Sequence, residues 1–237
     1  MKEVRYVAHR GFSMKAPENT IPAFELAGDS GFWGIECDTY CTVDGAWIVH
    51  HDRTVDRMTN GSGKVKDLTY AQTQELTIVS GHNISDYPGL RMPLLEETLA
   101  VCKRFGMFAF VEIEEYHRDA DLQALVEIVE RSGMIERCRF ICFNAEDLRK
   151  VRKLHKSIPL GFLTSECPTE SDLDIVQSLA PAFLDYYHEK TTAEDIRRCH
   201  KAGIEVSVWT VNTHELAQPF ILAEVDYITT DTVLHQK

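Results

Sequence analysis

Short runs of apolar residues alternate with longer segments of helical periodicity along most of the chain. The short runs are typical of parallel strands that are buried on both faces. The longer segments carry apolar residues three and four positions apart, as an amphipathic helix does. We expect strands at 5–9, 34–38, 108–114, 139–143, 160–163, 182–185, 205–209 and 227–229, and helices at 21–30, 95–104, 121–132, 145–155, 192–202 and 213–222.

This alternation predicts the fold class. Repeated strand–helix units form a parallel sheet, and eight strands within 237 residues favour a closed (β/α)8 TIM barrel, which typically takes about 250 residues. We expect residues 1–237 to form a single domain. The alternation breaks at about 40–94, where a turn, a short strand at 47–50 and a polar stretch indicate an inserted loop region after the second strand. Loops at the carboxyl ends of barrel strands build active sites, so this insertion is expected to serve function.

Composition narrows the partners. The chain has 25 Lys and Arg against 37 Asp and Glu, a net charge of −12, with 44% hydrophobic residues. A nucleic-acid binder would show a basic face, and an anionic membrane surface would repel this charge. The chain has no run of about 18 apolar residues, so we expect no membrane span. The composition therefore argues against these two classes of partner, nucleic acid and an anionic membrane surface.

The cysteines and the start of the sequence indicate a compartment. Seven cysteines, an odd number without a CxxC pair, are typical of reduced thiols. The Cys37/Cys41 and Cys138/Cys142 pairs are interpreted as ordinary buried thiols rather than metal ligands. The first residues, MKEVRYVAHRG, lack the apolar segment of a signal peptide. We therefore expect a cytoplasmic protein.

Two pairs of carboxylates stand on neighbouring predicted strands. Glu36 and Asp38 are two positions apart, as are Glu112 and Glu114, so each pair shares one face of its strand. If both faces line the barrel mouth, the like charges raise one another's pKa. A hard divalent cation such as Mg²⁺ or Ca²⁺ relieves that repulsion. In the alternative, one pair faces the helices and forms ordinary ion pairs; two pairs beside a His-Arg sequence favour a metal site.

Two histidines are candidates for acid–base catalysis. His9 and His51 follow predicted strands, and imidazole exchanges protons near neutral pH. With Arg10 and a cation holding the phosphoryl oxygens, one histidine would activate the nucleophile and the other would protonate the leaving oxygen. His50 competes with His51, and alternation along the chain allows only one of them to face the site.

An ordered set of short motifs spans nearly the whole chain. The motifs are AHRG at 8–11, APENT at 16–20, GIECD at 34–38, TVDG at 42–45, VHHD at 49–52, TNGSG at 59–63, DLT at 67–69, MPLLEE at 92–97, WTVN at 209–212 and VDYITTD at 225–231. Together they resemble the glycerophosphodiester phosphodiesterase family. The resemblance implies a (β/α)8 barrel with a small insertion after the second strand. It also implies hydrolysis of glycerophosphodiesters to glycerol 3-phosphate and an alcohol with a divalent cation.

The resemblance also implies roles for individual residues. Carried over by motif, these are His9 and His51 as the acid/base pair, Arg10 as the phosphate ligand, Glu36, Asp38 and Glu112 as metal ligands, Glu18 and Asn19 as supports, and Trp209 as a wall of the substrate pocket. The family histidine directly precedes an Asp, which selects His51 over His50. A core or lid aromatic is the alternative for Trp209.

One position departs from the family pattern. The third strand usually reads Glu-hydrophobic-Lys, with the Lys near the phosphate, but here it reads Glu112-Ile113-Glu114. Three outcomes remain open for Glu114, which is assigned to substrate binding. It could add to the metal site or meet a cationic headgroup such as choline or ethanolamine. In the third outcome another base, for instance Lys64, Lys66 or Arg91, supplies the lost charge.

Two other functions compete with glycerophosphodiester hydrolysis. A phospholipase-D-like enzyme acting on lysolipids would share the histidines and carboxylates, but the polar stretch at 80–90 offers little apolar surface for lipid. A non-catalytic binding barrel, disabled at Glu114, is the third hypothesis. The intact histidines and metal ligands argue against it.

Overall fold

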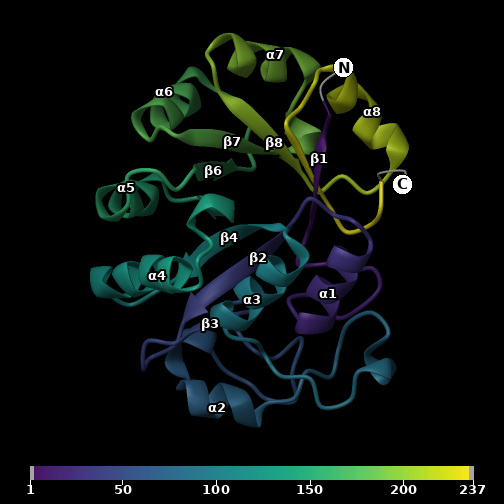
Figure 1. Ribbon diagram of the computed structural model, residues 1–237, viewed down its shortest axis with the longest axis vertical. Helices are drawn as coiled ribbons and strands as arrows, with labels where there is room; N and C mark the ends of the chain where they lie inside the picture. The colour runs from purple at the N-terminus through teal and green to yellow at the C-terminus, as the bar shows by residue number, and fades with distance from the viewer. Residues whose placement is uncertain (1–2, 235–237) are drawn as a thin grey trace.

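Eight parallel strands close into a barrel in the computed structural model, which describes residues 3–234 (Figure 1). Neighbouring strands follow the chain around the barrel, and β9 returns to pair with β1. The pairing of β1 with β2 completes the circle. These strands are β1 (Arg5–Ala8), β2 (Gly34–Cys41), β4 (Phe108–Glu115), β5 (Cys138–Cys142), β6 (Leu160–Thr164), β7 (Ala182–Tyr187), β8 (Glu205–Trp209) and β9 (Tyr227–Thr230).

Helices surround the barrel and confirm the predicted (β/α)8 class (Figure 1). They are α1 (Ile21–Asp29), α3 (Leu95–Phe105), α4 (Asp119–Arg131), α5 (Ala145–Leu154), α6 (Glu170–Ser178), α7 (Ala193–Lys201) and α8 (His214–Leu222). The sequence pattern did not predict α6, which begins at a capping box formed by Thr169 and Asp172. Within residues 3–234, no helix has both the length and the apolar character needed to cross a membrane.

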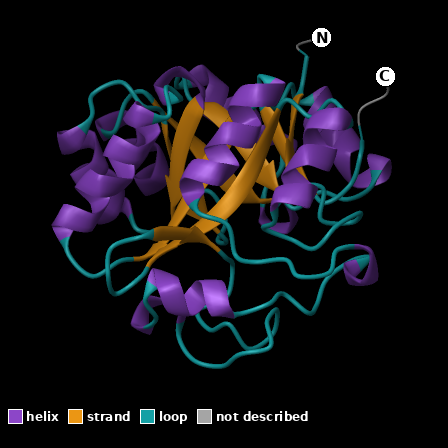
Figure 2. Ribbon diagram, turned by 60° about the horizontal axis from the view of Figure 1, so that its bottom comes forward, coloured by secondary structure: helices purple, strands orange, loops and turns teal. Residues whose placement is uncertain are grey.

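The segment between β2 and α3 packs at one end of the barrel (Figure 2). It contains the expected short strand, β3 (Trp47–Val49), antiparallel to β2. It also contains a helix that the pattern did not predict, α2 (Tyr70–Glu75), capped by Thr69 and Gln72. A small apolar cluster holds this segment against β2: Tyr40, Ile48, Val55, Met58, Val65, Ile78 and Met92. The insertion is thus a packed structure at the strand ends.

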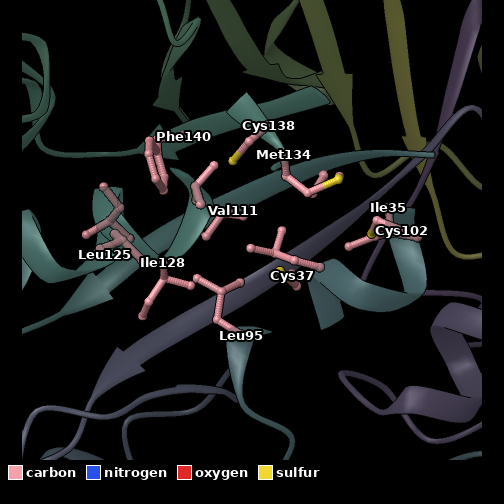
Figure 3. Packing of buried hydrophobic residues seen from close by; sticks show 14 of the residues in the cluster. Ile35, Cys37, Leu95, Cys102, Val111, Leu125, Ile128, Met134, Cys138 and Phe140 are labelled. Atoms are coloured by element: carbon pink, nitrogen blue, oxygen red, sulfur yellow. The ribbon is translucent and has the colours of Figure 1, made fainter. Parts of the chain in front are cut away.

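The main core lies between the strands and the helices (Figure 3). Cys37, Cys102 and Cys138 meet there with Leu95 and Val111. Cys37 therefore faces the helices, as the alternation along its strand predicts. All seven cysteines are free, and burial raises the pKa of the Cys102 thiol to about 12. These buried thiols act as small apolar side chains.

A second apolar layer fills the inside of the barrel. The Phe110 ring packs edge-on against Phe183 and Tyr227, and the rings of Phe183 and Tyr227 are tilted at 50° to each other, with centroids 5.4 to 5.6 Å apart. Val7, Ile141 and Leu163 complete the layer, and each of these six side chains is buried. This layer closes the barrel, so polar chemistry is confined to the mouth where the strands end.

The outer core sets the stability of the barrel. Leu125 of α4 is fully buried among core residues, whereas Leu216 of α8 is 45% exposed. We expect Leu125→Ala to lower the free energy of unfolding by about 2–5 kcal/mol because it leaves a cavity. Leu216→Ala, the matched control, should change it by about 0.5 kcal/mol or less. Urea denaturation measures both, and equal values for the two variants would contradict this packing.

Candidate active site

A cavity of about 250 Å³ opens at the carboxyl ends of the strands. Its wall includes all eight residues that the sequence singled out for catalysis, metal binding or substrate binding: His9, Arg10, Glu36, Asp38, His51, Glu112, Glu114 and Trp209. The chain positions that carry them lie up to 200 residues apart (9 to 209). Closure of the barrel therefore brings the candidate residues into one place.

The turn after β1 holds Arg10 over the second strand. Arg10 has φ +55° and Gly11 has φ +79°, both in the left-handed region. A Cβ at Gly11 would lie 2.7 Å from the Ala23 backbone, so the turn requires glycine there. The Arg10 backbone N–H donates to Glu36 Oε2 at 2.9 Å. Its guanidinium Nε lies 3.5 Å from Asp38 Oδ2, so main chain and side chain both turn toward the carboxylates.

Three carboxylates meet at the base of the cavity. Glu36 and Asp38 of β2 are 3% and 2% exposed, and Asp38 stands in register with Glu112 of β4. Oxygens of the three lie within 4.8 Å of one another. Burial and the Asp38 charge raise the pKa of Glu36 and Glu112 well above the usual range. Asn19 Nδ2 donates to Asp38 Oδ2 at 2.6 Å, which fixes one member of the group.

This carboxylate cluster fits a divalent cation. The buried Oε1 of Glu36 has no hydrogen-bond partner within the described part of the chain. An unpaired buried oxygen is costly, and oxygen-only donor sets suit hard ions such as Mg²⁺ and Ca²⁺. Residues Glu36, Asp38 and Glu112 would hold the ion. Glu114 lies on the cavity wall outside this group.

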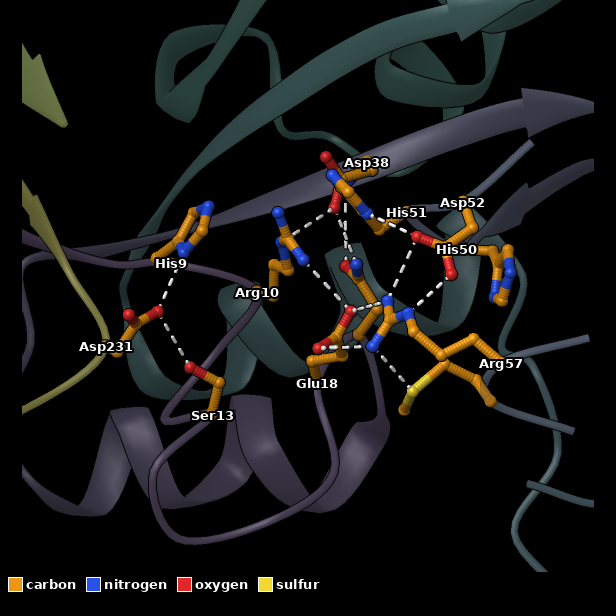
Figure 4. Close-up of polar contacts among 12 residues, drawn as sticks. His9, Arg10, Ser13, Glu18, Asp38, His50, His51, Asp52, Arg57 and Asp231 are labelled. Carbon is orange, nitrogen blue, oxygen red and sulfur yellow. Dashed lines mark hydrogen bonds and ion pairs between the residues drawn. The ribbon is translucent and has the colours of Figure 1, made fainter. Parts of the chain in front are cut away.

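His9 is oriented by a carboxylate from the far end of the sequence (Figure 4). Its Nδ1 lies 2.7 Å from Asp231 Oδ1, which also accepts from Ser13 Oγ. Burial opposes ionisation of Asp231, but its bonds to His9 and Asn212 lower its pKa to about 2. An ionised Asp231 keeps the proton on Nδ1, which leaves Nε2 for chemistry. Nε2 lies 4.0 Å from Glu36 Oε2.

His51 has an equivalent partner (Figure 4). Its Nδ1 lies 2.8 Å from Asp52 Oδ1, and Arg57 donates to both oxygens of Asp52. Burial again opposes ionisation, but Arg57 and His51 lower the pKa of Asp52 to about 2. His50 is 3% exposed, and its Nε2 lies 3.0 Å from the Thr54 carbonyl oxygen. Only His51 of the two lines the cavity.

The bases that could replace the missing lysine lie elsewhere. Lys66 Nζ pairs with Glu115 at 3.6 Å, and Arg91 donates to backbone carbonyls of the insertion. Neither they nor Lys64 belong to the cavity wall within the described residues.

Burial, with the charge of Asp38, raises the pKa of Glu114 to about 7.

Several contributors were not identified from the sequence. Asp185, near the end of β7, is 2% exposed, and burial raises its pKa to about 7. Phe143 follows β5 and packs edge-on against Trp209, with centroids 5.9 Å apart. Asp231 lies in a quoted motif, but its distance from His9 along the chain hid the pairing. A carboxylate at the end of an apolar strand is the signal that could have identified Asp185.

Comparison with known proteins assigns the chain to a family. Residues 9–235 match the glycerophosphoryl diester phosphodiesterase family. A glycerophosphodiester phosphodiesterase of Caldanaerobacter subterraneus subsp. tengcongensis is 32% identical over 228 residues, which cover 95% of this chain and 93% of that protein. One from Bacillus altitudinis is 31% identical over 233 residues, covering 94% and 93%.

A solved structure agrees with the sequence comparison. It is an Oleispira antarctica phosphodiesterase in complex with the product sn-glycerol-3-phosphate, and it aligns with a TM-score of 0.89 at 26% identity. The alignment covers 96% of this chain and 92% of that one. Sequence and structure therefore agree over almost the full length, and the chain belongs to the glycerophosphodiester phosphodiesterase family.

Proposed function

We propose that this glycerophosphodiester phosphodiesterase hydrolyses its substrate with His9 and His51 as the acid/base pair and a divalent cation, Mg²⁺ or Ca²⁺, as cofactor. The observation that carries the proposal is the presence of two histidine–carboxylate pairs beside one buried carboxylate cluster. A general acid and a general base on one cavity suit displacement at phosphorus. The neighbour bound to sn-glycerol-3-phosphate supports glycerol 3-phosphate as the product here.

Positive charge around the phosphodiester comes from two sources. Arg10 lies among Glu18, Glu36 and Asp38, and these carboxylates raise the pKa of its guanidinium although burial opposes this. It therefore stays cationic and holds a phosphoryl oxygen. When bound, the cation supplies Lewis-acid polarisation of the phosphoryl group and compensates the carboxylate charge.

The histidines move the protons. The Nε2 of one histidine accepts the proton of the attacking oxygen while that oxygen bonds to phosphorus. The Nε2 of the other gives a proton to the alcohol oxygen as its bond to phosphorus breaks. Asp231 and Asp52 hold the Nδ1 protons throughout, so each ring presents the same nitrogen to the substrate. The net reaction consumes one water and releases glycerol 3-phosphate and an alcohol.

The structure also bears on the domain organisation and the cellular location of the enzyme. We propose that residues 1–237 work as one domain, because the insertion packs its apolar cluster on Tyr40 of β2. We also propose a cytoplasmic location, supported by seven free cysteines.

Removal of either histidine should slow the reaction. We expect His9→Ala and His51→Ala each to lower kcat by about 10²-fold or more, the scale of general acid–base catalysis. Release of glycerol 3-phosphate from glycerophosphocholine or glycerophosphoethanolamine measures the rate. His214→Ala, on the exposed start of α8, is the control and should keep normal turnover. Normal turnover without His9 or His51 would remove that residue from the mechanism, and faster turnover of lysophosphatidylcholine would favour the lysolipid alternative.

The carboxylate cluster should set the cation requirement. Chelation with EDTA is expected to abolish turnover, and Mg²⁺ or Ca²⁺ to restore it. Glu112→Gln removes one ligand charge and should raise the half-saturating cation concentration by about 10-fold or more. Glu127→Gln, an exposed carboxylate on α4, is the control. Full activity in EDTA would contradict the cofactor assignment.

Asp231 should act by positioning His9. Asp231→Asn keeps the size of the side chain but removes the charge that holds the Nδ1 proton. We expect kcat to fall by about 10²-fold or more with little change in KM and in the thermal midpoint. Asp56→Asn, whose carboxylate accepts from Gly63 in the insertion, is the matched control. A change confined to KM would show that Asp231 binds substrate instead.

A further inference from the structure

The cavity has two chemically different halves. The half built from the ends of β1, β2 and the short strand β3 carries Arg10 and the histidines. The opposite half is built from β4, β5, β7 and β8, and Glu114, Phe143, Asp185 and Trp209 line it. The proposed mechanism uses none of these four residues, which leaves this half free to recognise the rest of the substrate.

The cavity carries more negative charge than the reaction requires. Its wall has five carboxylates: Glu36, Asp38, Glu112, Glu114 and Asp185. Arg10, one divalent cation and the protonated histidine that acts as general acid supply four positive charges, against six negative charges when the five carboxylates are ionised and the phosphodiester is bound. The two carboxylates outside the metal cluster, Glu114 and Asp185, therefore remain uncompensated and attract a further cation.

Neither of these two carboxylates forms an ion pair within the described residues. Oδ1 of Asp185 is buried and has no hydrogen-bond partner within residues 3–234. Glu115, the neighbour of Glu114, pairs with both Arg53 and Lys66 outside the cavity. Arg10 and Arg53 attract the charge of Glu114 without pairing with it. Both carboxylates face the cavity, so a bound molecule can supply the missing partner.

An aromatic corner stands on the same half. Trp209 is held from below by its Nε1–H, which donates to the Asp185 carbonyl oxygen at 3.2 Å. Tyr187 packs beside it at 5.3 Å between centroids, and Phe143 packs edge-on. Phe143 is 50% exposed, so half of its surface remains available to contact a bound molecule. Aromatic faces bind alkylammonium groups, especially where a carboxylate stands nearby.

We propose that Glu114, Phe143 and Trp209 form a subsite for an organic ammonium group on the alcohol part of the substrate, as in a choline ester. This inference rests on the proposed function, because the ester must place its phosphoryl group at Arg10. Glu114 then supplies the carboxylate that attracts a cationic alcohol.

The test compares two esters of the same shape. Glycerophosphocholine carries a trimethylammonium group, and the 3,3-dimethylbutyl ester of glycerol 3-phosphate replaces that nitrogen with carbon and has no charge. Both esters are assayed at the same pH and cation concentration, so the charge of the alcohol is the one property that differs. We expect the wild type to favour the choline ester in kcat/KM by about 10-fold or more.

Variants locate the preference. Glu114→Gln should lower kcat/KM for the choline ester by about 10-fold and change that for the neutral ester by about 2-fold at most. Phe143→Leu, at an exposed position, should weaken the preference in the same direction. Glu115→Gln is the matched control: it removes an equal charge from the same strand but outside the cavity, and it should leave the ratio unchanged.

The outcomes separate the subsite from the mechanism. A wild-type ratio near one, or an equal loss for both esters in Glu114→Gln, would overturn the subsite while hydrolysis stands. If neither ester is hydrolysed with any cation, the proposed function fails. In that case, calorimetry measures the dissociation constants of the two esters. Tighter binding of the choline ester that is lost in Glu114→Gln supports the subsite, and equal dissociation constants for the two esters overturn it.

Discussion

The convergence of buried carboxylates at the mouth of the barrel is the constraint on which the site depends. Side chains two apart on β2 face inward together, and the register of β2 with β4 sets Asp38 beside Glu112. Charges this close in a water-poor environment repel one another strongly. The backbone N–H of Arg10 and the amide of Asn19 offset part of that repulsion. The rest is left for ligands, which is why we propose that this end of the barrel binds a cation and a phosphodiester together.

The rest of the barrel keeps this cluster in place. Below it, the aromatic layer around Phe110 fills the interior, and outside it the helices bury the opposite faces of the same strands. Residue 37 packs in the core while residues 36 and 38 face the cavity, so a one-residue slip of β2 would exchange the two sets. The apolar core therefore fixes the register, and the register fixes the chemistry.

The local rules of strands and helices predicted most of the fold, and the motifs named eight residues that the fold brings to one cavity. The strand at 205–209 has the predicted bounds, and five others end one to three residues later because hydrogen bonding continues past the apolar run. Strand β1 ends one residue earlier than predicted, and β5 begins and ends one residue earlier. Helices α2 and α6 were missed because their stability comes from caps and docking more than from periodicity. The pairing of His9 with Asp231 depends on barrel closure across 222 positions, and no local pattern contains it.

The position of Glu114 shows where family patterns stop predicting. In a site that binds a phosphodiester, a lysine at this place adds attraction for phosphate, and a carboxylate removes it. The cavity retains Arg10 and the carboxylate cluster, which we propose bind the phosphoryl group without that lysine. The exchange of lysine for Glu114 instead changes the charge of the half of the cavity where Phe143 and Trp209 meet. A single change of charge beside an existing aromatic corner alters which alcohol is bound while the histidines and their carboxylates keep their geometry.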